Sequence, residues 1–260
     1  MNYWQGILLG IVQGLTEFLP ISSSGHLVVA EAALGLTTPG VVVEVVLHVA
    51  TLLAVLIVYA NRIAQLVRGA IRGDIAVWRD IGLLALASVP AGLAGYFLAD
   101  VFERAFDSLF AVGCDFLLTG AILWSTRWVK PPVLDRPSAP AAGGIGLAQA
   151  LAIFPGISRS GTTIAAGMWA RIGPEKAAEF SFLLAIPAIA GAAVLQLSDL
   201  STSGTSIGWG PMAVSFLAAL AAGVVAIRLL VALLRRGTFH RFAPYCWGIG
   251  AVTIWWALIR

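Results

Sequence analysis

The sequence has few charged residues. Only 11% of its 260 residues are Asp, Glu, Lys or Arg, whereas about a quarter are charged in a typical soluble domain. Hydrophobic residues make up 59%, and the mean hydropathy is +0.92. This composition excludes an ordinary soluble domain and predicts an integral membrane protein. A net charge of +3 then reflects basic loops, so no nucleic-acid partner is expected.

Cysteine and histidine are also scarce. Cys114 and Cys246 both lie in apolar segments, where cysteine usually packs as a small hydrophobic residue. The chain carries no zinc, P-loop or dinucleotide-binding motif. No basic region precedes the first apolar run, so the N-terminal segment is expected to belong to the fold rather than to a signal peptide.

Long apolar runs take up most of the chain. Six of them approach or exceed the ~20 residues that a helix needs to cross the hydrocarbon layer: 40–60, 81–99, 107–127, 177–197, 211–234 and 243–259. Two more, 3–35 and 145–172, are interrupted near the middle by Pro, Gly and Ser. We expect an all-α polytopic membrane protein with about six transmembrane helices and two re-entrant helix-loop-helix segments.

The loops differ in charge. Basic residues gather in 62–79, 127–136 and 235–241, and these loops are predicted to be cytoplasmic. The loops at 100–107 and 198–210 are acidic or carry no base. With six crossings, this pattern requires each broken segment to enter and leave on one side, the first from outside and the second from inside.

The two broken segments resemble each other. A shift of 136 residues aligns QGLTEFLPISSSG (13–25) with QALAIFPGISRSG (149–161), with seven of thirteen positions identical. We predict one membrane domain, 1–260, made of two repeats, 1–128 and 145–260, with a Pro-, Ala- and Gly-rich linker at 129–144. An odd number of crossings inverts the second repeat, and inverted repeats with broken helices usually place a binding site near the midplane.

The residues around the two breaks suit an anion. Serines stand where a new helix begins, and two helix N-termini aimed at one place offer unpaired N–H groups and positive dipole ends. The predicted binding residues are Gln13, Ser22, Ser24, Gly25, Ser158, Ser160, Gly161 and Thr163. Alternatively, each serine is only a helix cap and Gln13 only packs or caps.

A second set of residues suggests catalysis: Glu17, Ser23, His26 and Arg159. An Arg at membrane depth needs an anionic partner, either Glu17 in a purely structural pair or a ligand phosphate. His26 lies three residues after Ser23, so on one helix the two could act as proton carrier and nucleophile.

Three more polar residues lie in apolar spans. Glu44 and His48 are one helical turn apart and form either a satisfied polar pair or a layer of support around the site. Asp115 has no assigned role beyond a helix-packing hydrogen bond.

These motifs resemble those of the undecaprenyl-diphosphate phosphatase family, the bacitracin-resistance proteins. The first family motif is similar to QGLTEFLPISSSGH at 13–26, and the second is similar to PGISRSGTT at 155–163. Similarity in EVVLHVATLLAV and SFLLAIPAIAG extends along most of the chain. The family pattern has Glu or Gln at the position of Gln13, and this chain has the amide. At the position of Ser24 the family often has Thr.

The resemblance implies hydrolysis of undecaprenyl diphosphate to the monophosphate carrier of cell-wall synthesis. It implies a multi-pass protein of the bacterial inner membrane, a site that faces the periplasm, and functional positions at Gln13, Glu17, Ser23, His26 and Arg159. It also implies a divalent cation, for which Mg²⁺ or Ca²⁺ held by Glu17 and phosphate oxygens is expected. The expected partners are the isoprenoid diphosphate lipid, membrane lipid and a second copy in a homodimer.

Several alternatives stay open at the level of sequence. The attacking group could be Ser23, His26, or a water activated by Glu17 and metal. A polyprenyl-phosphate flippase or transporter is the alternative from another class, because inverted repeats with broken helices are a transporter architecture. An intramembrane serine protease would have Ser and His, but no role for Arg159.

Overall fold

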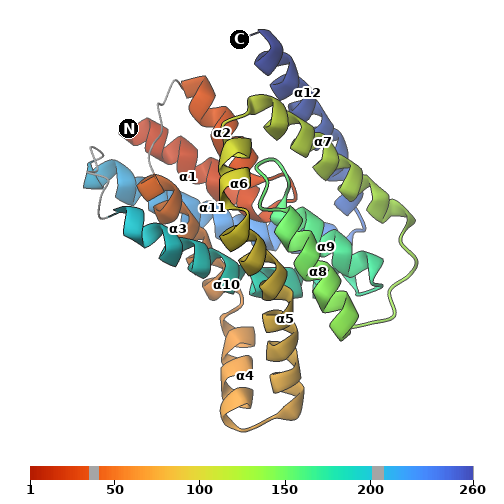
Figure 1. The fold of residues 1–260 in the computed structure, drawn as a ribbon. Helices are drawn as coiled ribbons and strands as arrows, with labels where there is room; N and C mark the ends of the chain where they lie inside the picture. Colours follow the sequence, from red (N-terminus) through yellow and green to blue (C-terminus); the bar gives the residue numbers. More distant parts are fainter. Residues whose placement is uncertain (35–40, 201–207, 260) are drawn as a thin grey trace.

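A computed structural model describes residues 1–34, 41–200 and 208–259, and these residues form helices joined by short connections (Figure 1). The first half contains α1 (Tyr3–Phe18), α2 (Ser23–Leu34), α3 (Val41–Val58), α4 (Ala60–Ile71), α5 (Ile75–Phe97), α6 (Ala99–Phe106), α7 (Leu109–Ser125) and the 3₁₀ turn η1 (Thr126–Trp128). The second half contains α8 (Ala139–Leu151), α9 (Arg159–Trp169), α10 (Pro174–Leu200), α11 (Trp209–Arg235), the 3₁₀ turn η2 (Phe239–Phe242) and α12 (Ala243–Ile259).

Within the described residues, five helices are long and apolar enough to cross a membrane: α5, α7, α10, α11 and α12. The sixth predicted crossing, 40–60, corresponds to α3, which turns by 74° into α4 after Val58. In the most apolar stretch of α5, only 11% of the residues are buried inside the protein. Apolar helices that leave such surface uncovered need lipid around them, so the prediction of an all-α polytopic membrane protein is confirmed.

The two halves pack against each other reciprocally. In Figure 1, α1 of the first half lies along α11 of the second, and α8 of the second half contacts α5 of the first. The remaining large contacts pair α7 with α12, and α3 with both α11 and α10. The shift of 136 residues relates α1 to α8, so this exchange is the packing that two related repeats would produce.

Small residues allow the close approach of these helices. A Cβ added to Gly10 would stand 2.3 Å from the carbonyl oxygen of Ser215, and one added to Gly146 would stand 2.5 Å from that of Ala87. Gly10 and Gly146 are equivalent positions in the two repeats. Small residues at helix interfaces let backbones approach closely within a membrane, where dispersion contacts provide much of the attraction.

Each predicted broken segment is a pair of helices that contact each other, α1 with α2 and α8 with α9. The second pair starts earlier than residue 145, because Ser138 accepts a hydrogen bond from the Ala141 amide and α8 begins at Ala139. Helix therefore occupies the end of the range predicted as linker. The repeat boundaries and the side from which each pair enters the membrane stay predictions.

Candidate functional site

The two breaks meet in space. The Gly156 amide donates to Ser22 Oγ at 3.2 Å, and Ser160 Oγ donates to the Leu19 carbonyl at 3.2 Å. A Cβ on Gly25 would lie 2.9 Å from the Gly156 Cα, so the backbones of the two breaks are in contact there. The convergence expected from the internal repeat is therefore observed.

The breaks share a capping arrangement. Ser22 Oγ accepts from the Gly25 amide at 3.4 Å, and the equivalent Ser158 Oγ accepts from the Gly161 amide at 3.0 Å. Ser22 also has a φ of +69°, in the left-handed region that non-glycine residues seldom adopt. Ser22 and Ser158 are thus helix caps, and the left-handed turn at Ser22 sets the direction in which α2 leaves the break.

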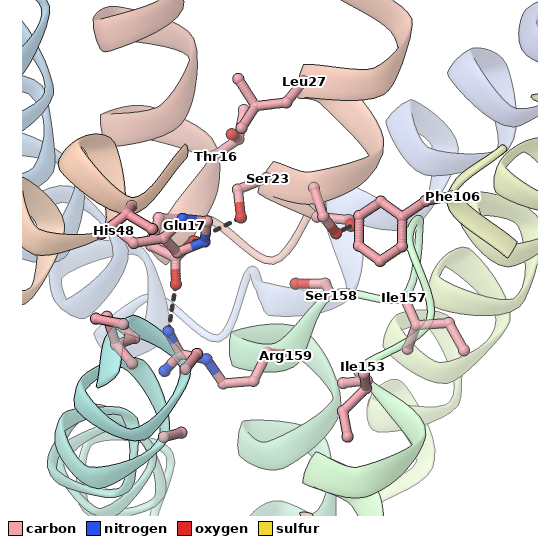
Figure 2. Close-up of a pocket in the computed structure, with 18 residues that line it drawn as sticks. Thr16, Glu17, Ser23, Leu27, His48, Phe106, Ile153, Ile157, Ser158 and Arg159 are labelled. Carbon is pink, nitrogen blue, oxygen red and sulfur yellow. Dashed lines mark hydrogen bonds and ion pairs between the residues drawn. The ribbon is translucent and has the colours of Figure 1, made fainter. Parts of the chain in front are cut away.

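Glu17 is the centre of the site (Figure 2). Its Oε1 accepts a hydrogen bond from Arg159 Nη2, and its Oε2 accepts one from Ser23 Oγ at 2.5 Å. Gln13 Nε2 donates to the same Oε2 at 3.1 Å. The carboxylate lies at the end of α1, while Ser23 and Arg159 each begin a helix, α2 and α9. The carboxylate, the hydroxyl and the guanidinium therefore come from three helices and from both halves of the chain.

The repeat explains why these residues differ from one another. Ser23 and Arg159 are equivalent positions, and so are Glu17 and Ile153. One repeat supplies the carboxylate and hydroxyl, and the other supplies the guanidinium. Since the second repeat has Ile153 in place of an acid, it adds no carboxylate at the position equivalent to Glu17.

A cavity of about 340 Å³ opens beside these groups. Its polar lining residues are Glu17, Ser23 and Arg159, together with Ser22, Ser24, Ser158, Thr16 and His48. Its apolar lining residues are Leu27, Val45, Phe106, Ala152, Ile153, Ile157, Ala188, Ile189, Ala192 and Ala193. A lining of both kinds suits an amphiphile with a polar head and a hydrocarbon tail.

Arg159 retains a donor for a ligand. Its Nη2 binds Glu17, but its Nη1 is buried and has no hydrogen-bond partner within the described residues. A buried donor without a partner costs free energy, particularly on a charged group. Because Arg159 lines the cavity, a bound phosphate oxygen would satisfy this donor.

His26 lies away from this group, contrary to the expectation that it pairs with Ser23. Its Nδ1 is 2.6 Å from the Ser22 carbonyl oxygen, and its Nε2 is 2.7 Å from Tyr245 Oη. The imidazole stacks on the Tyr245 ring and packs edge-on against Phe116. His26 is not among the residues that line the cavity. On α2 its side chain is directed toward Phe116 of α7 and Tyr245 of α12, and its role in catalysis stays a prediction.

Five predicted binding residues contact other groups of the protein and are not among the residues that line the cavity. Ser160 binds the Leu19 carbonyl, the Gly161 amide is taken by Ser158, and Thr163 shares a 2.6 Å hydrogen bond with Ser181. Gly25 allows the close contact with Gly156, and Gln13 orients Glu17. These side chains shape the site, whereas Ser22, Ser24 and Ser158 are the ones that reach the cavity.

His48 takes a more central place than the sequence indicated. Its Nε2 lies 3.9 Å from Glu17 Oε2, and it lines the cavity. The sequence could have indicated this place, because His48 is a polar residue within an apolar span and lies one helical turn from Glu44. The side chain of Glu44 lies outside the described residues. Asp115 on α7 does not line the cavity.

The side chains around the cavity could bind a metal cation only if that cation needs few protein ligands. In the described parts of the chain, no three His, Cys, Asp or Glu side chains form a group that could hold a metal ion. Among the described residues that line the cavity, Glu17 is the one carboxylate, and Ser23 Oγ lies beside it. Mg²⁺ usually keeps several waters and binds through one or two carboxylates plus substrate phosphates, so this set can accommodate it.

Comparison with known proteins identifies the family. A family described as bacitracin resistance protein BacA matches residues 6–252. The chain belongs to this family. A protein of Desulfosudis oleivorans named undecaprenyl-diphosphatase is 40% identical over 96% of this chain and 97% of its own length. Proteins with the same name from Carboxydothermus hydrogenoformans and Parabacteroides distasonis are 39% and 38% identical, over 98% and 100% of this chain and 97% and 100% of their own lengths. The BacA resemblance predicted from the motifs is confirmed.

Proposed function

We infer that this protein is an integral membrane phosphatase that hydrolyses undecaprenyl diphosphate to undecaprenyl phosphate and inorganic phosphate. Membership of the BacA family and full-length relatives named undecaprenyl-diphosphatase support this activity. One structural observation carries it: Glu17 joins the Ser23 hydroxyl to the Arg159 guanidinium in the wall of a cavity that is also lined by apolar side chains. The product recycles the lipid carrier of peptidoglycan synthesis, and this recycling is the basis of bacitracin resistance.

The cavity matches both parts of such a substrate. The diphosphate would lie against Arg159 and the N-termini of α2 and α9, where unpaired amides and the guanidinium favour negative charge. The isoprenyl chain would lie against the apolar lining residues, which include Phe106 of α6 and Ala192 of α10. The head group thus loses water only where charged and polar groups replace it.

We propose that Ser23 attacks the terminal phosphorus. Glu17 Oε2, 2.5 Å from Ser23 Oγ, takes the hydroxyl proton as the new P–O bond forms. The bond to the bridging oxygen breaks, Glu17 returns the proton to that oxygen, and undecaprenyl phosphate leaves. Water then attacks the phosphoserine while Glu17, ionised again, takes a proton from the water; the bond from phosphorus to Ser23 Oγ breaks, Oγ recovers the proton, and inorganic phosphate is released. Arg159 stabilises charge on the transferred group throughout.

We propose that Glu17 also holds a divalent cation, Mg²⁺ or Ca²⁺, together with phosphate oxygens of the substrate. The substrate brings two or more negative charges, and Arg159 is the one Lys or Arg among the described residues that line the cavity. When bound, the cation would offset phosphate charge. Withdrawal of divalent cations with a chelator is expected to lower the rate, and re-addition to restore it.

We further propose an inner-membrane location with the cavity facing the periplasm. The basic loops at 127–136 and 235–241, predicted to be cytoplasmic, follow the ends of α7 and α11, whereas Phe106 precedes α7 and lines the cavity. Labelling of single cysteines from either side of intact cells tests this orientation. A homodimer is a separate proposal, which cross-linking in native membranes would test.

The activity is tested by phosphate release from undecaprenyl diphosphate in detergent, without a membrane gradient. Ser23→Ala is expected to release phosphate at least about a hundredfold more slowly than wild type. Ser88→Ala is the matched control, since Ser88 bonds to the Leu84 carbonyl in α5 and does not line the cavity. Terminally labelled substrate should leave label on Ser23. Phosphohistidine, or full activity of Ser23→Ala, would contradict the serine step.

The transporter alternative gains no support from the comparisons, since the relatives carry the name of a phosphatase. Lipid binding without phosphate release in the same detergent assay would contradict the phosphatase assignment.

A further inference from the structure

A second cavity, of about 460 Å³, lies at the far end of the helices from the phosphatase site. Three segments form it: the end of α7 with the chain that follows, the turn between α9 and α10, and the end of α11 with η2. Pro174 at the start of α10 lines this cavity, and Ala192 in the same helix lines the first. At 1.5 Å per residue, these positions are roughly 27 Å apart.

The walls combine basic and apolar side chains. Arg127, Lys130 and His240 supply the basic groups, and no Asp or Glu is among the lining residues that the structure describes. Met168, Ile172, Leu234 and Phe239 supply apolar surface. This combination fits an anionic group attached to hydrocarbon.

The positive charge here is not neutralised by the protein. None of the ion pairs in the described ranges involves Arg127 or Lys130. A neighbouring cavity shows the contrast: there Arg62 binds both Asp80, at 3.0 Å, and Glu179, at 2.7 Å. Basic groups that share a cavity without a counter-charge favour an anion from outside.

Arg127 is held in place by aromatic rings. Its guanidinium carbon lies 4.3 Å from the centre of the Trp124 ring and 5.6 Å from that of Trp128. His240 packs edge-on against the same Trp124. Stacking fixes the plane of the guanidinium and leaves its N–H groups free to bind an oxyanion.

A strained backbone position adds another basic residue beside the cavity. Arg171, at the end of α9, has a φ of +64°, where glycine is the usual residue. Its Nε and Nη2 donate to the carbonyl of Pro131, a lining residue, at 3.3 and 3.2 Å. The chain thus tolerates backbone strain at a place where a long cation holds the wall of the cavity.

We propose that this cavity is a second binding site, which takes a phosphate group. The loops around it are those predicted to be cytoplasmic, so the phosphate can come from the head group of an anionic phospholipid in that leaflet or from free inorganic phosphate. The apolar side chains beside the basic groups are suited to the first source. This site is separate from the phosphatase site and does not depend on the activity inferred above.

The test uses the full-length protein in detergent and two probes, phosphatidylglycerol and inorganic phosphate. Native mass spectrometry measures retention of phosphatidylglycerol against phosphatidylcholine, and a thermal unfolding shift measures phosphate. The variant Arg127→Gln with Lys130→Gln removes two charges from the cavity. The control Arg68→Gln with Arg79→Gln removes two exposed charges from α4 and α5, outside it.

We expect the cavity variant to bind phosphatidylglycerol about tenfold more weakly or worse, while the control binds as wild type. If the cavity variant loses only the shift in unfolding temperature caused by inorganic phosphate, the site binds free phosphate and the lipid source is rejected. If both probes bind the cavity variant and the control equally, the proposal is overturned.

Two further measurements control for misfolding of the double variant and for loss of phosphatase activity. If the double variant does not fold, the exposed Lys130→Gln alone, with Arg79→Gln as control, is expected to weaken binding about three- to fivefold. Both variants should release phosphate from undecaprenyl diphosphate at the wild-type rate. A failure at this cavity is therefore distinct from a failure of the phosphatase assignment.

Discussion

Ser22 Oγ accepts a hydrogen bond of 3.2 Å from the amide of Gly156, a residue 134 positions later in the chain. This contact ties the break of one repeat to the break of the other. It places Ser23 and Arg159, the residues that follow the two capping serines, on either side of Glu17. The group formed by Glu17, Ser23 and Arg159 therefore exists only when both halves of the chain are folded and packed.

Replacing Glu17 by Gln should abolish most of the activity. The amide cannot take the proton of Ser23, and it leaves the Arg159 guanidinium buried without a counter-charge. We expect phosphate release to fall by about a hundredfold or more. Glu175→Gln is the control, since Glu175 forms an exposed pair with Arg235 at 2.9 Å. Wild-type turnover in Glu17→Gln would exclude Glu17 as the base.

Arg159→Lys should not be a conservative change. One nitrogen of the guanidinium binds Glu17 while the other is free for a phosphate, and a single ammonium cannot reproduce this fork. We expect kcat/KM for undecaprenyl diphosphate to fall at least about tenfold, with the far-UV circular dichroism unchanged. Arg235→Lys serves as control. Equal kinetics of Arg159→Lys and wild type would show that Arg159 only pairs with Glu17.

Two substitutions of His26 should separate positioning from proton transfer. The Asn side chain can place an N–H near the position of Nδ1, which contacts the Ser22 carbonyl, whereas the Gln side chain reaches toward the position of Nε2 and Tyr245. If His26 supports the Ser22 turn, His26→Asn should retain at least about fivefold more activity than His26→Gln. Equal and complete loss in both, with unchanged thermal stability, would favour the imidazole as proton carrier.

Gly156→Ala should disrupt the site through the backbone. Gly156 has a φ of +109°, and an added Cβ would lie 2.5 Å from the Val112 carbonyl oxygen and 2.7 Å from the Asp115 Cβ. We expect a loss of roughly 2 kcal/mol or more in stability, seen as a lower unfolding temperature, together with reduced turnover. Gly173→Ala is the control, because nothing lies within 4 Å of its added Cβ. Equal unfolding temperatures would show that the break tolerates a side chain.

Much of the architecture could be predicted from local pattern. Helix formation in lipid depends on runs of apolar residues, so the spans realised as α5, α7, α10, α11 and α12 were evident. The breaks were evident because Pro, Gly and Ser interrupt such runs, and the repeated polar register indicated that the breaks belong together. Glu17, Ser23 and Arg159 were evident because polar residues at membrane depth cost free energy unless they have partners.

The sequence by itself thus determined the membrane class, the two breaks and the family. Only the tertiary structure decided which polar groups face one another. Spacing on one helix suggested a Ser23–His26 pair, but the turn at Ser22 directs Ser23 toward Glu17, while Tyr245, 219 residues away in the chain, holds His26 elsewhere. His48 reached the cavity in the same way, through packing of α3 beside α1. The reason is physical: local pattern reports burial and helix ends, whereas side-chain pairing depends on how distant helices pack.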